Sequence, residues 1–417
     1  MHRFQIIKTV IVFVATLCTS QAHAAYTVRL MPNSSSPVVF SLEISPQHGN
    51  LLQTRSQPSE VKNPRCGPIM LEQRTPDEWI VPDNCQRVEW EINFSPAPDK
   101  GIGNLMGRHS VAFSNWWSIV EQKALLRQPG DESASEITIK QSGRKDIKSY
   151  VPSTKDMSEF YVVGNVEELE RTVGDVHIRY VSDDLNTAKR RGMISMHVEA
   201  YSKLRAMFKN MLPTPFDWEL LVIMAGNPRP DGIAGSGAAR SLVFDYPRDT
   251  DKADAFLLMT VAHEQFHQLR ALSTASAGQS FIASASHFMW LEEGLAEYYG
   301  LKIVKGSKRS DDEKNKVWNA FVDILRPVEN GLKKLNAEYN RGDQSVYPLF
   351  YTQGATFFSE IDQAIIQASE GRTSLDAYVT RLAGTTDGDI DPKIVNEWRG
   401  IAGKQIDALI ARYVGSP

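Results

Sequence analysis

Two hydrophobic patterns divide the chain. Up to about residue 185, short apolar runs alternate with polar positions, as in Val38–Ile44 and Val88–Phe94, and Pro, Gly, Asn and Asp separate them. A period of two with such breaks is typical of antiparallel strands. Further strands are predicted at Phe160–Val163 and Val176–Tyr180, whereas the polar stretch Asp131–Lys148 predicts a loop. The first part of the chain is therefore predicted to be a β-domain.

The period changes beyond residue 185. Apolar residues recur at helical spacing over 194–211 and 251–272, and short apolar runs at 220–224 and 241–246 predict buried strands. From Leu291 the pattern is helical to the end, interrupted by a charged turn at 305–316. The expected fold class is α+β multidomain, with an N-terminal antiparallel β-domain at 25–185, an α/β unit at 186–305 and a helical region at 306–417.

The first 24 residues have the pattern of a cleavable secretory signal. Arg3 and Lys8 precede the apolar run 9–18, and Ala22 and Ala24 place small residues before the predicted cleavage point. A run of about ten apolar residues is too short to cross a bilayer, which takes about 20. No later stretch is long and apolar enough to span a membrane. The protein is therefore expected to be exported, either periplasmic or secreted.

The cysteines agree with export. Cys18 lies in the predicted signal, which leaves Cys66 and Cys85, 19 positions apart in a Pro-rich segment of the β-domain. Two cysteines in an exported chain favour one disulfide. The alternative is a pair of free buried thiols.

Composition and charge exclude several classes. The chain has 417 residues, 42% of them hydrophobic, which is typical of folded domains and not of disordered or fibrous chains. Lys and Arg number 46 against 50 Asp and Glu, for a formal charge of −4, and no dense basic stripe is present. Nucleic acid is therefore not expected to be a partner.

One motif indicates metal chemistry. His263-Glu264-Gln265-Phe266-His267 has the H-E-x-x-H pattern inside a segment that can be continuous helix. Residues four apart lie on one helical face, so both imidazoles can reach one ion. Glu264 then lies beside the ion and can take a proton from a water that the ion activates. Within 30 residues downstream of His267, the candidate third ligands are His287, Glu292 and Glu293, and spacing does not choose among them.

The residues after the motif resemble a known family. HEQFH followed by WLEEGLAEYYG is similar to the gluzincin zinc metallopeptidases, closest to the glycyl-aminopeptidase-like and aminopeptidase-N-like branches. The resemblance implies a thermolysin-like catalytic domain, one Zn²⁺ per chain and Glu293 as the third ligand, with Glu292 at the variable position before it. The glycyl-aminopeptidase-like family often ends in a PDZ domain, for which this chain has no room.

Two more residues gain roles from this comparison. Glu297, four residues after Glu293 on the same helical face, is placed to hydrogen-bond a metal-binding imidazole. The segment Phe350–Phe358 is similar to the Y-x-K-G-A segment of these families, which implies that Tyr351 stabilises the oxyanion. Gln353 replaces the usual lysine. The alternatives are a solvated helix acid for Glu297 and a structural aromatic for Tyr351.

The chain departs from the family ahead of the motif. The aminopeptidases carry a glutamate there that holds the substrate's free amine, and the matching residues here are Gly232, Ile233, Ala234 and Gly235, with Ala234 in place of that glutamate. Small side chains at 232–239 still predict an edge strand to which an extended peptide can add by main-chain hydrogen bonds. The alternative is a plain glycine-rich turn.

The sequence therefore predicts an exported zinc metallopeptidase with a peptide or protein substrate. His263, His267 and Glu293 are expected to bind zinc, Glu264 to act as the base and Tyr351 to stabilise the oxyanion. The competing hypothesis is a catalytically weak or inactive peptide-binding or assembly protein with the same fold, since the amine anchor is missing.

Overall fold

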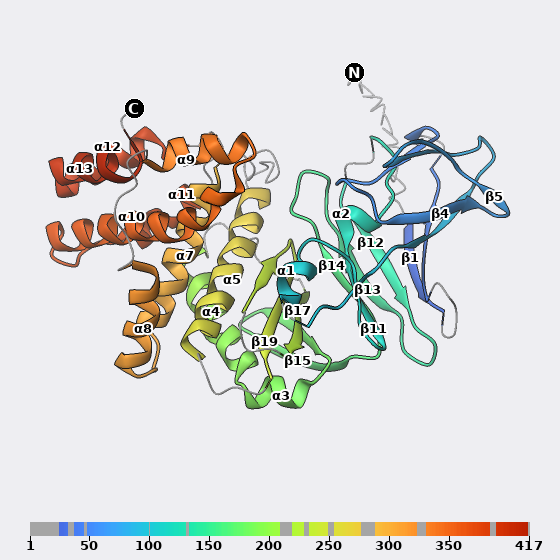
Figure 1. Ribbon diagram of the computed structural model, residues 1–417, viewed down its shortest axis with the longest axis horizontal. Helices are drawn as coiled ribbons and strands as arrows, with labels where there is room; N and C mark the ends of the chain where they lie inside the picture. Colours follow the sequence, from blue (N-terminus) through green and yellow to red (C-terminus); the bar gives the residue numbers. More distant parts are fainter. Residues whose placement is uncertain are drawn as a thin grey trace, which may run out of the picture.

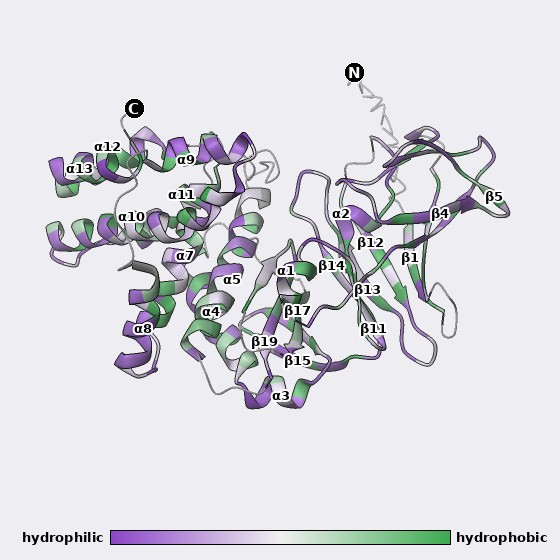
Figure 2. Ribbon diagram, in the orientation of Figure 1, coloured by the Kyte–Doolittle hydropathy of each residue, from purple (hydrophilic) through white to green (hydrophobic). Residues whose placement is uncertain are grey.

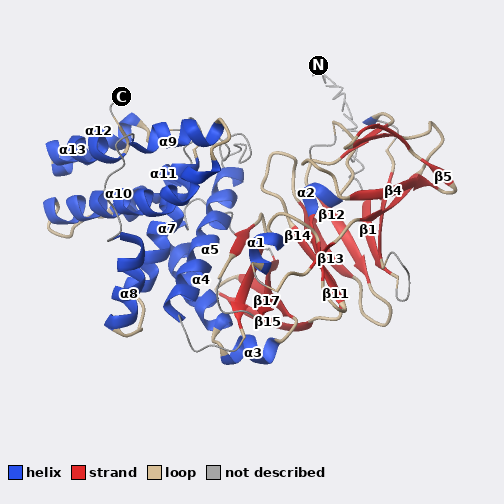
Figure 3. Ribbon diagram, viewed as in Figure 1, coloured by secondary structure: helices blue, strands red, loops and turns tan. Residues whose placement is uncertain are grey.

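The chain folds into a β-rich N-terminal part, a central sheet and a helical C-terminal part (Figures 1 and 3). The computed structural model describes residues 25–31, 37–45, 48–99, 101–130, 133–208, 219–228, 233–248, 254–276, 288–322, 331–383 and 389–415. The predicted signal, residues 1–24, lies outside this set. The described chain is a mixture of strands and helices with a helical C-terminal region, as the sequence predicted at that level.

The N-terminal part contains three sheets. Their strand orders are β13-β12-β1-β2-β8-β4-β5, β14-β11-β10-β9 and β3-β7-β6. The elements are β1 Ala25–Leu30, β2 Val38–Glu43, β3 Leu51–Gln53, β4 Val61–Cys66, β5 Ile69–Met70, β6 Glu72–Thr75, β7 Glu78–Ile80, β8 Arg87–Ile92, β9 Ser95–Pro96, α1 Ile102–Met106, β10 Val111–Ala112, β11 Trp116–Val120, α2 Glu121–Ala124, β12 Ser135–Lys140, β13 Ile147–Val151 and β14 Phe160–Gly164.

Alternation explains these strands where it is regular. In β8, Val88, Trp90 and Ile92 are buried and the residues between them are half-buried, as the period of two predicts. Two expectations were wrong. The stretch Asp131–Lys148 contains β12, whose Ile137 and Ile139 enter the core. The domain is also not purely antiparallel, because β1 pairs with β12 in parallel.

The predicted disulfide is present. Cys66 and Cys85 are bonded, with their Cα atoms 5.9 Å apart. The bond joins the end of β4 to the segment that leads into β8, so it closes a loop of the β-rich part.

The central sheet separates two cores. Its order is β15-β16-β17-β19-β18, and the elements are β15 Glu167–Val173, β16 Val176–Ser182, β17 Glu219–Asn227, β18 Gly235–Gly237 and β19 Ser241–Pro247. Strands β16, β17 and β19 are parallel, and β18 lies antiparallel at the edge. Along β17, Leu220 and Val222 pack toward the helices, whereas Leu221 and Ile223 pack toward the N-terminal part. Burial of both faces explains the continuous apolar run.

This sheet crosses the predicted boundary at residue 185. Strands β15 and β16 come before that residue, yet β16 pairs with β17 beyond it. The first two strands of the sheet therefore belong structurally with the segment predicted as catalytic. The division of the chain into domains otherwise stays a prediction.

The helices follow the sheet. They are α3 Leu185–Arg190, α4 Met193–Phe208, α5 Asp254–Ser276, α7 Met289–Lys305, α8 Asp311–Val322, α9 Gly331–Asn340, α10 Tyr347–Ala368, α11 Val379–Ala383, α12 Pro392–Ala402 and α13 Lys404–Tyr413. Hydrophilic and hydrophobic residues alternate along α12 and α13 (Figure 2), which bury Trp398 and Leu409 and expose their charged positions. In contrast, α5 and α7 are buried on nearly every side. No described helix has the length and apolar content needed to cross a membrane.

One helical expectation was wrong. The segment 305–316, predicted as a charged turn, contains the first residues of α8. Ser310 and Glu313 form a reciprocal cap: the Glu313 N–H donates to Ser310 Oγ at 3.3 Å, and the Ser310 N–H donates to Glu313 Oε2 at 3.0 Å. Such a cap starts a helix, and acidic residues in the first turn favour it.

Candidate metal centre

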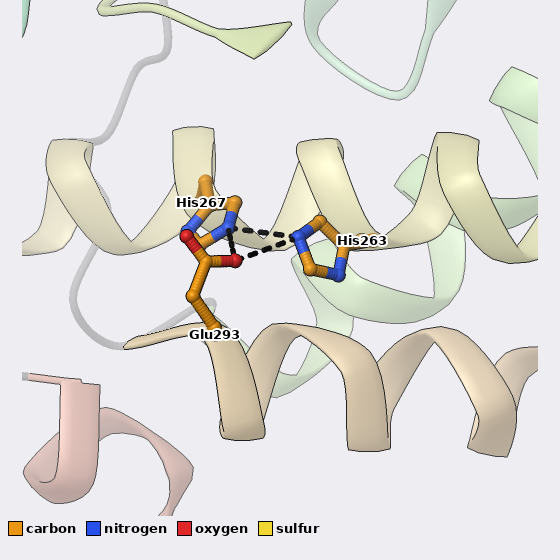
Figure 4. A group of neighbouring side chains, drawn as sticks. All are labelled: His263, His267 and Glu293. Atoms are coloured by element: carbon orange, nitrogen blue, oxygen red, sulfur yellow. Dashed lines mark hydrogen bonds and ion pairs between the residues drawn. The ribbon is translucent and has the colours of Figure 1, made fainter. Parts of the chain in front are cut away.

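Three side chains predicted as metal ligands meet between α5 and α7. His263 and His267 project from one face of α5, and Glu293 reaches up from α7 (Figure 4). The two Nε2 atoms lie 3.0 Å apart, and Glu293 Oε2 lies 3.2 Å from His263 Nε2 and 3.3 Å from His267 Nε2. The structure thus brings together two histidines and a glutamate that lies 26 positions after the second of them.

The spacing of these atoms fits zinc. Tetrahedral bonds of about 2.0–2.1 Å separate two ligand atoms by about 3.3 Å. The three observed separations, 3.0 to 3.3 Å, lie close to this value. Two imidazoles and one carboxylate are also a donor set that zinc accepts, and three protein ligands leave a fourth position for another ligand. The residues present therefore fit a catalytic zinc ion.

Glu297 fixes the orientation of His263. Its Oε2 lies 2.8 Å from His263 Nδ1, and both side chains are buried. A carboxylate only accepts hydrogen bonds, so Nδ1 of His263 carries the proton. The lone pair of Nε2 therefore points toward the other two metal-ligand atoms, on His267 and Glu293. This contact is the one predicted for Glu297 from its place four residues after Glu293.

The other candidate ligands are not in the cluster. Glu292 forms a buried ion pair with Arg270, and its Oε2 lies 3.7 Å from His267 Nδ1, too far for a hydrogen bond. His287 lies outside the described residues. Of the candidates that the structure describes, Glu293 is the one whose carboxylate lies within 3.3 Å of both histidines.

The electrostatics of the cluster favour positive charge at its centre. Burial alone would raise the pKa of Glu293, but His267 and His263 outweigh it and hold that pKa well below the usual range. Burial likewise opposes charge on His263, but Glu293 and Glu297 raise its pKa well above the ordinary value. A cation at this point, whether a proton or a metal ion, is stabilised by the same two carboxylates.

Glu264 lies beside the cluster and against the edge strand. The Gly237 N–H donates to Glu264 Oε2 at 3.0 Å. A Cβ on Gly235 would lie 2.7 Å from Glu264 Cγ, so only glycine allows β18 to come this close. Burial raises the pKa of the Glu264 carboxyl, while the positive charge of His263 and His267 lowers it. A main-chain donor thus holds this carboxyl group in place.

Two tyrosines complete this side, and sequence inspection missed one of them. Tyr347 donates to Glu293 Oε1 at 2.8 Å, and Tyr351 donates to the Tyr347 hydroxyl at 3.0 Å. The Tyr351 ring centroid lies 5.5 Å from that of His263. Tyr347 is four residues before Tyr351, so helical spacing was the signal that could have found it.

A pair of glycines brings these tyrosines to the site. Gly294 on α7 and Gly354 on α10 face each other, and a Cβ on either would lie within 2.8 Å of the other's Cα. The two helices therefore approach closely at this point, which places the first turns of α10 over Glu293. These glycines are the ones in the LEEG and TQGA segments.

The predicted substrate strand is in part observed. Gly232 lies outside the described residues, Ile233 and Ala234 precede β18, and Gly235 begins it. All three described residues line a cleft of about 600 Å³ together with His263, Glu264, His267, Glu293 and Tyr351. Within the described chain, β18 has a paired strand only on the β19 side, and the Gly237 N–H on its other edge donates to Glu264.

Comparison with known proteins agrees with this fold. No protein-family model and no curated protein matches the sequence. The crystal structure of an aminopeptidase N family protein from Idiomarina loihiensis superposes with a TM-score of 0.68 at 13% identity, covering 94% of this chain and 76% of that chain. Aminopeptidase A from Legionella pneumophila, in complex with aspartic acid, superposes with a TM-score of 0.52 at 12% identity, over 94% of this chain.

These similarities concern the fold. The present chain spans 49% of the Legionella protein, about half its length. At such identities a shared fold is shown, which confirms the predicted likeness to aminopeptidase-N-like proteins at the level of architecture. Roles for individual residues rest on the geometry described above.

Proposed function

We propose that this protein is an exported zinc-dependent metallopeptidase that hydrolyses peptide bonds. The observation that carries the proposal is the arrangement of three zinc-compatible donor atoms, 3.0 to 3.3 Å apart, next to the Glu264 carboxylate in a cleft with a strand edge. A structural zinc site closes all four positions with protein, whereas a catalytic site keeps one open beside a base.

His263, His267 and Glu293 hold the ion in this proposal. When bound, zinc polarises the scissile carbonyl and lowers the pKa of a water toward neutrality. Glu297 keeps the His263 Nδ1–H oriented, and Tyr347 does the same for the second oxygen of Glu293.

Glu264 moves the protons. It accepts a proton from the attacking water and delivers it to the leaving amine, which is the usual double role of a general base and acid. The Gly237 N–H steadies the carboxylate, and the elevated pKa that burial gives Glu264 brings the group nearer to the pH at which both transfers are balanced.

Tyr351 supplies the oxyanion donor. Its hydroxyl donates a hydrogen bond to the Tyr347 hydroxyl, which in turn donates to Glu293. Rotation of the Tyr351 hydroxyl toward the cleft gives the tetrahedral intermediate a donor at little cost, because Tyr347 is still held by Glu293. The peptide lies along β18 in extended form.

Export rests on the first 24 residues and on the disulfide. The Cys66–Cys85 bond is stable in oxidising compartments, and disulfides are rare in the cytosol. Mass determination of the mature amino terminus after expression with the full sequence tests the predicted cleavage.

Metal analysis and product masses test the enzyme. The purified protein is expected to contain one zinc per chain and to cleave members of a mixed peptide library, with cleavage stopped by a chelator and restored by zinc. Product masses from one defined peptide then locate the cut. Zinc binding without any cleavage, with or without chelator, contradicts the proposal and favours a peptide-binding protein of the same fold.

A further inference from the structure

The edge strand β18 lies between two helices that belong to different parts of the chain. Gly235 and Gly237 face α5, since a Cβ on Gly237 would lie 2.9 Å from the Glu264 carbonyl oxygen. Ser236 faces the other way, toward α1, and a Cβ on Gly107 would lie 2.6 Å from Ser236 Cβ. Successive residues of the strand thus meet the metal centre on one face and the N-terminal part on the other.

A buried carboxylate fixes α1 in this position. Asp245 on β19 is fully buried and accepts the Ala234 N–H at 2.6 Å and the Gly103 N–H at 3.2 Å. A Cβ on Gly103 would collide with the Ala234 carbonyl, so this position has no space for a side chain. The residues that follow α1 are therefore held against the cleft, although more than 150 positions of sequence separate them from each of the metal ligands.

This arrangement places Arg108 at the cleft. It follows Gly107 directly, is exposed, and lines the same cleft as His263 and Glu264. Its guanidinium has no hydrogen-bond or ion-pair partner within the part of the chain that the structure describes. Apart from the two histidines of the metal centre, it is the one basic side chain among the described residues that line the cleft.

The carboxylates of the cleft, in contrast, all have protein partners. Glu292 pairs with Arg270, Glu297 with His263 and Glu264 with the Gly237 N–H. Glu293 contacts both histidines and Tyr347. A bound divalent ion and Arg270 would further offset most of this negative charge. The open charge that faces a substrate is therefore the positive charge of Arg108.

We infer that the cleft selects peptides that carry a carboxylate on the α1 side of the bound chain, and that Arg108 binds it. The inference rests on the proposed function, because it places an extended peptide along β18. Side chains of such a peptide alternate between the two faces, so one points toward the metal centre and the next toward α1. The carboxylate belongs to an acidic side chain or to the carboxyl terminus of the substrate.

Binding to an inactive variant tests this without turnover. The zinc-loaded Glu264→Gln protein is titrated with fluorescently labelled peptides of one neutral sequence, in which a glutamate replaces glutamine at each position in turn and the carboxyl terminus is free or amidated. Peptides with a suitably placed carboxylate are expected to bind about 5- to 20-fold more tightly than the neutral amidated parent, the range between exposed ion pairs and charge-assisted hydrogen bonds.

Variants of Arg108 identify the source of the preference. Adding Arg108→Ala is expected to remove the difference and leave the parent peptide's affinity unchanged, while Arg108→Lys retains part of it. Arg74→Ala, at an exposed arginine on β6 away from the cleft, is the matched control and should change nothing. A gain for internal glutamate alone indicates side-chain recognition, and a gain for the free carboxyl terminus alone indicates terminus recognition.

The result can overturn the inference separately from the proposed function. Equal affinity for all peptides, or an acidic preference that survives in Arg108→Ala, contradicts the role of Arg108. A preference that depends on Arg108 in a protein whose wild type cleaves none of these peptides contradicts hydrolysis and leaves the recognition intact. If no peptide binds at all, the role of Arg108 is wrong, and cleavage by the wild type decides the proposed function separately.

Discussion

Two buried side-chain clusters, one with two histidines and one with a single histidine, lie on opposite faces of α5, and they differ in the chemistry of the histidines' partners. On the cleft side, His263 and His267 contact the carboxylates of Glu297 and Glu293. On the core side, His197 of α4 contacts only neutral groups: Nε2 donates to Gln265 Oε1 at 2.8 Å, and Nδ1 accepts from the Tyr180 hydroxyl at 2.8 Å.

The partners decide what each histidine can do. Burial lowers the pKa of His197 to about 4, and its hydrogen bond to Gln265 only partly opposes this, so the ring is neutral and both nitrogens are used. The carboxylates around His263 instead stabilise positive charge on its ring. Its Nε2 points toward the other metal-ligand atoms, including Glu293 Oε2. Burial alone therefore does not distinguish the two environments; the carboxylates and the lone pair beside His263 do.

Removal of the Glu264 carboxylate should have the largest effect. In Glu264→Gln the peptidase rate is expected to fall about 10²- to 10⁴-fold, because the amide cannot accept the proton from water. The zinc content should stay at one per chain, since Glu264 is not among the three clustered donors. Initial rates on one peptide, with metal analysis of the same sample, provide the measurement. Normal turnover in this variant would show that another group is the base.

Protonation of His197 in acid should have the next largest effect, a loss of folding stability. The folded-state pKa of His197, about 4, lies below the ordinary 6.5, so the unfolded chain binds the proton more readily. Stability from this group is fully present above pH 6.5 and is lost as the pH falls toward 4, by about 3 kcal/mol in all. Urea unfolding of the wild type and His197→Gln between pH 7 and pH 4 checks this. Parallel losses in both proteins would contradict it.

Loss of Glu297 should weaken zinc binding while leaving the ligands in place. Glu297→Ala removes the acceptor of the His263 Nδ1–H, and such changes lower metal affinity about 10- to 100-fold. Competition with a zinc-binding dye gives the dissociation constants. His197→Gln, on α4 against the opposite face of α5, is the matched control and should keep the wild-type affinity. An unchanged affinity in Glu297→Ala would make Glu297 a simple buried partner.

The sequence predicted the α5 cluster because its information is local. Residues four apart must share a helical face, so His263 and His267 followed from the motif alone. The prediction of Glu293 as the third ligand required the family resemblance, because spacing alone left three candidate ligands. Tyr347 and the Gly294–Gly354 contact were missed, since they depend on how α10 crosses α7.

The fold could be predicted where apolar periodicity was regular. Strand β8 and helix α5 followed from it, and β17 and β19 followed from continuous apolar runs, with ends shifted by a few residues. The strand β15 has no such signal, because EELERTV is a mostly exposed edge strand that pairs only with β16. The position of α1 depends on Asp245 and two glycines, which are contacts over a long sequence distance and leave no local pattern.

A change at Gln265 should separate the two clusters within the motif itself. Gln265 follows Glu264 directly in sequence, but its side chain is fully buried and faces the core. There it accepts a hydrogen bond from His197 and donates one to Gln268. Gln265→Leu leaves the His197 Nε2–H without an acceptor, which should lower the free energy of unfolding by about 1–2 kcal/mol. Zinc content and peptide cleavage should stay within about two-fold of wild type, because the cleft face of α5 is unchanged. Gln265→Glu sharpens the comparison further: a carboxylate there would raise the pKa of His197 and reduce the stability lost in acid. If Gln265→Leu instead released the zinc, the two faces of α5 would be coupled. The hydrogen bonds of Gln265 with His197 and Gln268 would then help to position the metal ligands.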